Sequence, residues 1–403
     1  MKYNYDKKLL SSLGVGPFLG QVKLREKMIA QADDAPPVSI YNANILAKKL
    51  HPNVQYAVVS AVTEHADARS YTLVPDAESG TEQLAYFRAG QYVSVALDIG
   101  EARLNKPYTI RSCPKDALNG SYTLTIKRSA AGFASDYIQN NWQAGTKVRL
   151  SAPLGEFYHQ ELRDAKQVVA LAGGSGITPF YSMAAAIADG TEDFSLTILY
   201  GSRTRDAILL GKELDEIAAK SGGRVKVVHV LSHEEAEGCE KGFLTAELVK
   251  KYAPEGDYSV YVCGPKAMYG FMAQELPKLG LKARRIRMEV PGEYGDPSGD
   301  AAYPAEAAGK VFTVTVTVRG ETQTVSCRAD QTLLDAMERA GIRAPSHCRS
   351  GECGWCHSRL ISGEVYIPED TDGRRLADKK FGWIHPCCTY PLSDVALDVP
   401  TLL

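Results

Sequence analysis

The sequence predicts a multidomain protein: an antiparallel β-barrel, then an α/β domain with a parallel sheet, then a smaller α+β domain. Three observations lead to this prediction. Short alternating strands recur from Val54 to Leu150, strands and helices alternate from Gln167 to Leu279, and a new alternating strand begins at Val311. The chain has 403 residues, which is enough for several domains of roughly 100–200 residues each.

The barrel is predicted within residues 51–160. The runs Gln91–Leu97 and Ser121–Arg128 alternate apolar and polar residues and are bounded by turn residues. A period of two is typical of antiparallel strands that bury one face. Repetition of such short runs favours a barrel over a single hairpin.

Residues 1–50 show no clear period and are predicted only as an N-terminal extension of unknown role, with a short helix considered at Asn44–Leu50. Basic residues precede Leu9–Gly20, but Gly and Pro interrupt that segment, so we expect no signal peptide. No apolar run reaches the ~18–20 residues that a membrane helix needs. We therefore expect a cytoplasmic protein without a membrane span.

Strands and helices alternate within residues 161–290, which predicts a parallel sheet with helices on its faces. The predicted strands are Gln167–Ala172, Phe194–Tyr200, Arg224–Leu231 and Tyr258–Cys263. The predicted helices begin at Pro179, near Gly211 and after Phe243, and the last of them ends at Leu279.

A linker is predicted at residues 291–309, which are rich in Pro, Gly and Ala. As a flexible coil it would span roughly 25 Å. The last domain, residues 310–403, opens with the alternating strand Val311–Val318. A helix is predicted at Thr332–Ala340, and Gly341 stands where a C-terminal cap glycine is expected.

The charge balance argues against nucleic acid as a partner. The sequence has 46 Lys and Arg against 48 Asp and Glu, a formal net charge of −2. Nucleic-acid-binding domains usually carry a basic excess. Hydrophobic residues at 44% and charged residues at 23% are ordinary for a globular protein.

The cysteines near the C-terminus are spaced for an iron–sulfur cluster. Cys348, Cys353 and Cys356 follow the pattern C-x4-C-x2-C, and Cys387 and Cys388 come about 30 residues later. Four thiolates in this spacing hold a plant-type [2Fe–2S] cluster. Structural zinc usually needs two short knuckles, and disulfides are unexpected without export. Simple buried cysteines do not explain the spacing. The residues alone leave the fourth ligand open between Cys387 and Cys388.

A glycine-rich turn follows the first α/β strand. Such a turn at a helix N-terminus presents N–H donors to a phosphate. Its residues are Gly173, Gly174, Ser175, Gly176, Ile177, Thr178 and Pro179. It is not the G-x-G-x-x-G fingerprint, and a tight strand-to-helix turn without a ligand is the alternative.

Four motifs together make the chain resemble the ferredoxin–NADP reductase superfamily over Val54–Val290. In family order they are Lys106-Pro107-Tyr108-Thr109, Gly132-Phe133-Ala134-Ser135, the glycine-rich turn and Cys263-Gly264-Pro265. Residues 310–403 resemble a plant-type ferredoxin, which implies a β-grasp-like fold. The ending of that family, with the ligand four positions before a proline, implies Cys387 as the fourth ligand.

The resemblance implies a flavin site on the barrel. Tyr108 would pack on the flavin ring, Thr109 would lie near flavin N5, and Lys106 would meet the flavin phosphate beside Pro107. This chain has Lys106 where the family usually has Arg, and Lys lacks the bidentate fork of a guanidinium. Gly132 and Ser135 would line the pyrophosphate, which implies FAD, with FMN as the alternative.

The resemblance also implies a nicotinamide site. The residues implied there are Gly173, Gly174, Gly176, Thr178, Pro179, Cys263, Gly264 and Pro265, and Cys263 would lie beside the nicotinamide. Ser202 and Arg203 follow the second strand, where this family reads the adenosine ribose. Arg203 or Arg205 would suit the 2′-phosphate of NADPH, whereas Asp206 would suit the ribose hydroxyls of NADH. The sequence leaves this choice open.

This order of modules implies an enzyme, an NAD(P)H-dependent iron–sulfur flavoprotein oxidoreductase. It would move a hydride to a bound flavin and then single electrons through a [2Fe–2S] cluster to a separate terminal oxidoreductase. Reductase components of multicomponent oxygenases and demethylases share this layout. One alternative is a self-sufficient reductase acting on a diffusible quinone, flavin or ferric complex. Another is a redox-sensing or docking protein without catalytic turnover.

Overall fold

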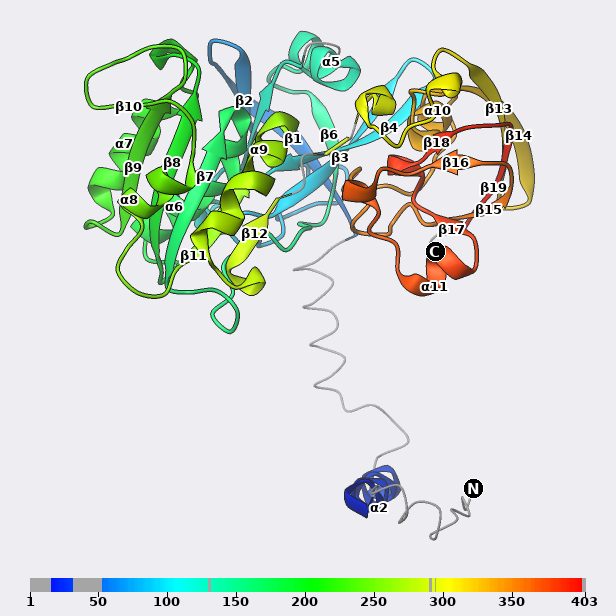
Figure 1. Cartoon of the computed structure of the whole chain (residues 1–403), viewed down its shortest axis with the longest axis horizontal. Helices are drawn as coiled ribbons and strands as arrows, with labels where there is room; N and C mark the ends of the chain where they lie inside the picture. The colour runs from blue at the N-terminus through cyan, green and yellow to red at the C-terminus, as the bar shows by residue number, and fades with distance from the viewer. Residues whose placement is uncertain (1–15, 32–52, 130–131, 290–291, 294, 401–403) are drawn as a thin grey trace. The chain divides into compact units, whose positions relative to one another are not determined.

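The computed structural model describes residues 16–31, 53–129, 132–289, 292–293 and 295–400, within two units, Met1–Leu50 and His51–Leu403 (Figure 1). In the first unit, α2 (Gly16–Gln31) is a helix that the sequence analysis did not predict. Pro17 lies in its first turn, where a missing N–H costs no hydrogen bond. The helix considered at Asn44–Leu50 lies outside the described residues. No described helix is long and apolar enough to cross a bilayer.

The first sheet of the second unit is antiparallel, with six strands in the order β4-β3-β6-β1-β2-β5. The bounds are β1 Val54–Glu64, β2 Ala68–Pro75, β3 Tyr92–Ile99, β4 Ala102–Thr109, β5 Tyr122–Lys127 and β6 Lys147–Ser151, with α4 Pro114–Leu118 and α5 Phe133–Asn141. Its two edges approach each other, because Ile110, just after β4, bridges Leu124 of β5. The predicted barrel is confirmed as a half-barrel.

The second sheet has six strands in the order β10-β9-β8-β7-β11-β12, and all its pairs are parallel. The strands are β7 Gln167–Gly173, β8 Ser195–Ser202, β9 Val225–Leu231, β10 Glu240–Lys241, β11 Ser259–Cys263 and β12 Ile286–Met288; the helices are α6 Thr178–Ala188, α7 Gly211–Lys220, α8 Ala246–Tyr252 and α9 Lys266–Glu275. The predicted strand–helix alternation is confirmed.

Strand β7 shows why helices cover both faces of this sheet. Val168, Ala170 and Ala172 belong to the core shared with α6 and α7. Val169 and Leu171 belong to the core shared with α8 and α9. Successive side chains of a strand point to opposite faces, so an uninterrupted apolar strand must be covered on both.

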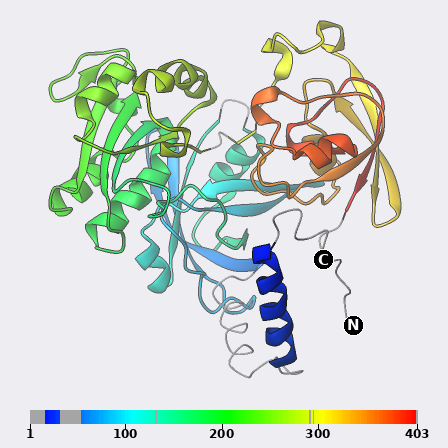
Figure 2. The ribbon, with the colours of Figure 1, turned by 60° about the horizontal axis from the view of Figure 1, so that its bottom comes forward.

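The third sheet has five strands in the order β14-β13-β19-β15-β17, beside a pair formed by β16 and β18. The bounds are β13 Val311–Val318, β14 Glu321–Arg328, β15 Ser358–Ser362, β16 Val365–Tyr366, β17 Trp383–Ile384, β18 Tyr390–Pro391 and β19 Val395–Val399, with α10 Leu333–Arg339 and α11 Leu376–Lys380. The first and last strands, β13 and β19, pair in parallel, and they run side by side in Figure 2.

Helix α10 packs its buried Leu333, Leu334 and Met337 against Val314 and Val316 of β13. Its predicted ends are close to those observed. The Thr332 hydroxyl accepts a hydrogen bond from the Asp335 N–H at 3.1 Å, and Gly341 has φ 79°, the left-handed conformation that ends many helices. The α+β prediction for this domain is confirmed.

Described residues of the predicted linker pack against the third domain. Tyr303 is 7% exposed, its hydroxyl donates to the Ala329 carbonyl at 3.1 Å, and its ring meets Tyr366 edge-on at 5.2 Å between centroids. The Tyr390 hydroxyl donates to the carbonyl of Gly295. Composition suggested flexibility, but one buried aromatic side chain holds the segment against the third domain.

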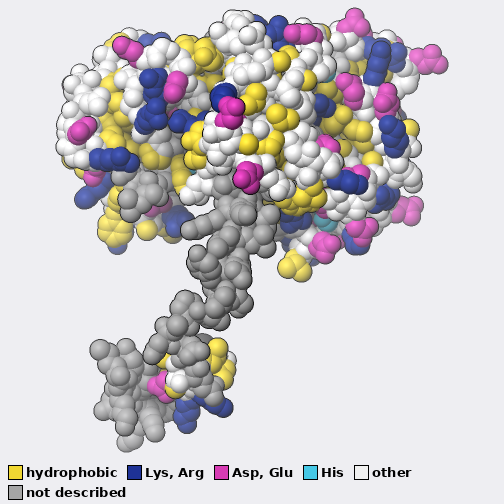
Figure 3. All heavy atoms as spheres, turned by 180° about the vertical axis from the view of Figure 1, so that it is seen from behind, with side chains coloured by type: hydrophobic (Ala, Val, Ile, Leu, Met, Phe, Trp, Pro, Cys, Tyr) yellow, Lys and Arg dark blue, Asp and Glu magenta, His cyan; other side chains and the backbone are white. Residues whose placement is uncertain are grey.

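Charged side chains of both signs are intermixed over the face shown in Figure 3. This pattern agrees with the near-neutral net charge of −2. That face therefore lacks the broad basic field that would attract a polyanion.

Candidate functional site

Strand β4 places the first motif at the edge of the half-barrel, where Pro107 costs no ladder hydrogen bond on the open side. Tyr108 is half-buried and packs against the barrel core. Burial raises the pKa of its phenol, so the ring stays neutral. Lys106 points to the linker instead, with its Nζ 2.6 Å from a carboxylate oxygen of Glu293.

The second motif forms the start of α5. Gly132 is the N-cap residue, and the buried Ser135 hydroxyl donates to the Gly132 carbonyl and accepts from the Ser129 N–H, both at 3.1 Å. A Cβ on Gly132 would lie 2.0 Å from Ser135 Oγ. Ser135 therefore closes the turn that opens the helix.

The glycine-rich turn and the Cys263 segment meet at the carboxyl ends of two neighbouring parallel strands, since Ala172 of β7 pairs with Cys263 of β11. A Cβ on Gly176 would lie 2.2 Å from the Cys263 carbonyl oxygen. Glycine is required at position 176 because its backbone touches that of Cys263. Ligands bind at this edge of open α/β sheets.

One cavity of about 750 Å³ gathers residues from all three domains. Of the predicted site residues, those that line it are Pro107, Tyr108, Thr109, Gly176, Thr178, Cys263, Gly264, Cys348 and Cys353. Lys106 and the α5 motif are not among its described lining residues. The barrel strand, the nicotinamide-type turn and the cysteine loop thus share one space.

The sequence analysis missed part of the lining. Residues 125–127 on β5 and 154–157 after β6 contribute, as do Tyr92 and Tyr269. These residues belong to no motif. They lie at ordinary strand and loop positions and reach the cavity only because the sheet curves. Glu289 also lines the cavity.

Burial keeps the Cys263 side chain a neutral thiol. Desolvation is the main cause that raises its pKa well above the usual value, and the charge of Glu289 adds to it. A thiol in this state is a weak nucleophile. Cys263 is therefore suited to packing against a ligand rather than to covalent chemistry.

The four predicted cluster ligands come together. The Cys348 thiol interacts with those of Cys353 and Cys387, and Cys387 interacts with Cys356. The N–H groups of Ser350 and Cys353 point at Cys348 Sγ, at 3.5 and 3.4 Å. Backbone donors around sulfur are expected where a protein holds and tunes a cluster.

The cysteine loop has the C-x4-C-x2-C spacing of a [2Fe–2S] ligand set. In the part of the chain that the structure describes, no group of three or more His, Cys, Asp or Glu side chains has the arrangement to hold one metal ion. A [2Fe–2S] cluster is larger and divides its four ligands between two irons. Gly351 has φ +84°, and a Cβ there would lie 2.0 Å from the Thr371 carbonyl oxygen.

Cys388 is occupied elsewhere. Its thiol donates to the carbonyls of Thr371 and His385 at 3.5 and 3.4 Å, and its side chain is 1% exposed. Cys388 also contacts the Cys387 thiol, and Cys387 as the fourth ligand stays a prediction from the resemblance.

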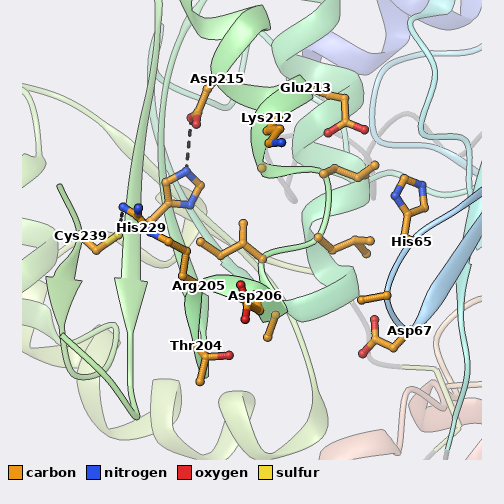
Figure 4. A pocket seen from close by; sticks show the side chains of 16 residues that line it. His65, Asp67, Thr204, Arg205, Asp206, Lys212, Glu213, Asp215, His229 and Cys239 are labelled. Carbon is orange, nitrogen blue, oxygen red and sulfur yellow. Dashed lines mark hydrogen bonds and ion pairs between the residues drawn. The ribbon is translucent and has the colours of Figure 1, made fainter. Parts of the chain in front are cut away.

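A second cavity, of about 870 Å³, lies beside the loop that follows β8 (Figure 4). Arg205 and Asp206 line it, together with His65 from the β1–β2 turn. The Arg205 guanidinium donates to the Glu237 backbone carbonyl at 2.7 Å, and the Arg205 backbone N–H donates to the Glu234 carboxylate. Ser202 and Arg203, the predicted ribose readers, are not among the described residues that line this cavity.

Three family models match the chain. They are an oxidoreductase FAD-binding domain at residues 55–159, an oxidoreductase NAD-binding domain at 170–274 and a 2Fe-2S iron-sulfur cluster binding domain at 316–392. The predicted flavin, nicotinamide and iron–sulfur modules are confirmed at this level.

Two curated relatives cover most of the chain. The ferredoxin reductase component of 3-ketosteroid-9-alpha-monooxygenase from Mycobacterium tuberculosis is 32% identical over 350 residues, 85% of this chain and 94% of that protein. The glycine betaine monooxygenase reductase subunit of Chromohalobacter salexigens is 25% identical over 352 residues, 84% and 94% of the two chains.

The solved structure of phthalate dioxygenase reductase shares the fold, with a TM-score of 0.62 and 23% identity over 86% of this chain and 98% of that one. Domain order, the shared cavity and these relatives agree. The chain belongs to the family of oxidoreductases of the ferredoxin–NADP reductase superfamily that join FAD-binding, NAD-binding and C-terminal [2Fe–2S] domains, the family of oxygenase reductase components.

Proposed function

We propose that this protein is the reductase component of a two-component system and passes electrons from NADH to a separate terminal oxygenase. The observation that carries the proposal is the single cavity lined by Tyr108, Cys263 and Cys353. A donor, a flavin and a cluster held by these three segments would share this cavity. The names of the relatives support a separate oxygenase as acceptor.

When bound, the flavin accepts a hydride and releases single electrons, which the [2Fe–2S] cluster carries onward. The protein itself would orient the bound donor and flavin relative to each other. Tyr108 presents a neutral aromatic side chain to the cavity, and Thr109 presents a hydroxyl beside it. The Thr178 hydroxyl donates to the Ser175 carbonyl at 3.0 Å, which holds the phosphate-binding turn in shape. Hydride transfer needs no protein acid or base, and the neutral thiol of Cys263 is consistent with that.

The loop after β8 supports NADH as the donor. Asp206 lines the cavity beside this loop, and the Glu234 carboxylate accepts from the Arg205 backbone N–H. The carboxylates of Asp206 and Glu234 would repel the 2′-phosphate of NADPH. We expect kcat/KM for NADH to exceed that for NADPH by at least about tenfold.

The proposal is tested with the purified holoprotein. Its visible spectrum should show flavin bands together with iron–sulfur absorbance, and NADH should bleach both. Cys353→Ser and Cys387→Ser should abolish NADH-dependent cytochrome c reduction and leave ferricyanide reduction by the flavin. Cys388→Ser is the matched control and should retain both activities.

Equal cytochrome c activity before and after Cys353→Ser would refute the route through the cluster. It would favour the alternative, a self-sufficient reductase of small acceptors. A spectrum with flavin and no iron–sulfur contribution would refute the assignment of the cysteine loop. Absence of any NADH oxidation would favour a redox-sensing protein.

A further inference from the structure

The half-barrel and the third domain are joined by a chain of four charged side chains. Lys106 pairs with Glu293 at 2.6 Å, Glu293 pairs with Arg349, and Arg349 pairs with both carboxylate oxygens of Glu338 at 2.8 and 2.7 Å. We call this set, Lys106, Glu293, Arg349 and Glu338, the latch. Its positive and negative charges alternate and balance.

The inner half of the latch is buried. The side chains of Arg349 and Glu338 are 1% and 0% exposed, whereas those of Lys106 and Glu293 are 16% and 36% exposed. Removing two charges from water is expensive, and replacing a buried ion pair by apolar side chains often stabilises a protein. The stability of the fold is therefore a poor reason for this arrangement.

The latch residues also hydrogen-bond to the backbone of strand β4, which carries the predicted flavin motif. The Asn105 N–H donates to Glu338 at 3.2 Å, and the Asn105 carbonyl accepts from Arg349 at 3.1 Å. The Asn105 amide donates to the Ser346 hydroxyl at 3.4 Å. Strand β4 is an edge strand, so its open side has unpaired backbone groups. Side chains of the third domain satisfy them.

The latch contacts involve residues next to both predicted cofactor-binding segments. Asn105 directly precedes the flavin motif 106–109, and Arg349 directly follows the predicted ligand Cys348. Arg349 has φ 59°, a conformation that is unfavourable for any residue but glycine and that marks functional sites when the surroundings enforce it. Arg349, strained and buried next to Cys348, thus bonds to Asn105, which is next to the flavin motif, and so connects the two cofactor-binding segments.

We propose that the latch is a positioning device that holds the cysteine loop against strand β4 and so fixes the separation between flavin and cluster. Arg349, Glu338 and Glu293 are positioning residues for the one-electron step between the two cofactors, in which no bond is made or broken. This inference rests on the proposed function. It adds that the third domain works while docked on the barrel and does not swing on a tether.

The test separates the two electron-transfer steps by stopped flow in the full-length holoprotein. Glu293→Gln removes the central charge from outside both cofactor segments. Arg349→Lys keeps a positive charge, but its single ammonium cannot bridge Glu293, Glu338 and the Asn105 carbonyl as a guanidinium does. Arg328→Lys is the matched control, because the exposed guanidinium of Arg328 pairs with Asp330 in the same domain and lies outside the latch.

In both latch variants, reduction of the flavin by NADH should stay within about twofold of wild type, since the nicotinamide segments are untouched. Transfer from flavin to cluster should slow by at least about tenfold, because misplacement by ~1 Å can cost up to a hundredfold. Iron content and the absorbance of the oxidised cluster should not change. Arg328→Lys should leave both steps unchanged.

Unchanged flavin-to-cluster transfer in both variants would overturn the proposal. Loss of the cluster from both would also overturn it, because the network would then serve folding of the loop rather than its placement. If only Arg349→Lys loses the cluster, the rate of flavin-to-cluster transfer in Glu293→Gln decides whether the proposal holds. Failure of NADH to reduce the flavin of the wild type would refute the proposed function instead, so the two failures are distinguishable.

Discussion

Gly176→Ala tests the contact between the glycine-rich turn and the Cys263 segment. The added Cβ would lie 2.2 Å from the carbonyl oxygen of Cys263 and 2.5 Å from its carbonyl carbon. Ordinary contact begins at 3.4 Å, so the two segments must separate by about 1.2 Å. Both obstacles are backbone atoms between neighbouring strands β7 and β11, and neither can rotate away as a side chain would.

We expect two effects from this separation. Overpacking should lower the free energy of unfolding by about 1–3 kcal/mol. Moving the nicotinamide-binding segments by about 1 Å should slow flavin reduction by NADH up to roughly a hundredfold. Ferricyanide reduction by flavin that has been reduced chemically should stay unchanged, because the barrel is not altered.

The assay is anaerobic stopped flow of flavin bleaching over a range of NADH concentrations, with thermal unfolding as the stability measurement. Gly270→Ala is the matched control. Gly270 lies within α9, and nothing is within 4 Å of a Cβ placed there, so alanine should stabilise the helix by about 0.5–1 kcal/mol. A Gly176→Ala protein that is reduced at the wild-type rate would refute the close contact and its role.

Three further predictions concern other parts of the chain. Gly351→Ala should prevent cluster assembly, because its Cβ would lie 2.0 Å from the Thr371 carbonyl oxygen, and iron analysis should show flavin without iron. The control Gly320→Ala, at a positive φ with open space, should retain the cluster. An iron-replete Gly351→Ala protein would contradict the loop geometry. The raised pKa of Cys263 means that the thiol stays protonated as pH rises through the usual range for cysteine, so kcat/KM for NADH should show no break from this group between about pH 6 and 9. Cys239 and Cys263 are both partly exposed, and mass spectrometry should find Cys263 alkylated by iodoacetamide more slowly than Cys239, because the thiolate is the nucleophile. Tyr303→Ala should destabilise the third domain by about 3 kcal/mol and Tyr303→Phe by about 1 kcal/mol, measured as thermal loss of cluster absorbance. Equal melting temperatures of Tyr303→Ala and wild type would favour the hypothesis of a flexible linker.

The sequence alone determined the order of the modules and much of their local structure. Strand Val311–Val318 has the predicted bounds and helix Gly211–Lys220 begins where predicted, because side-chain periodicity is set by the pitch of each element. The cysteine spacing and the glycine-rich turn are equally local, since their chemistry requires particular backbone angles over a few residues. Each of these features lies within one short stretch of chain.

Only the tertiary structure decided which of these stretches meet. Lys106 and Glu293 are 187 positions apart, and Asn105 and Arg349 are 244 apart; no local pattern encodes such contacts. Composition predicted a flexible linker, whereas Tyr303 of that segment is buried. The resemblance implies that Lys106 meets a flavin phosphate, and only the structure shows its ion pair with Glu293 of the linker. Motifs report what a segment can bind, and the packing of distant segments decides which of them act together.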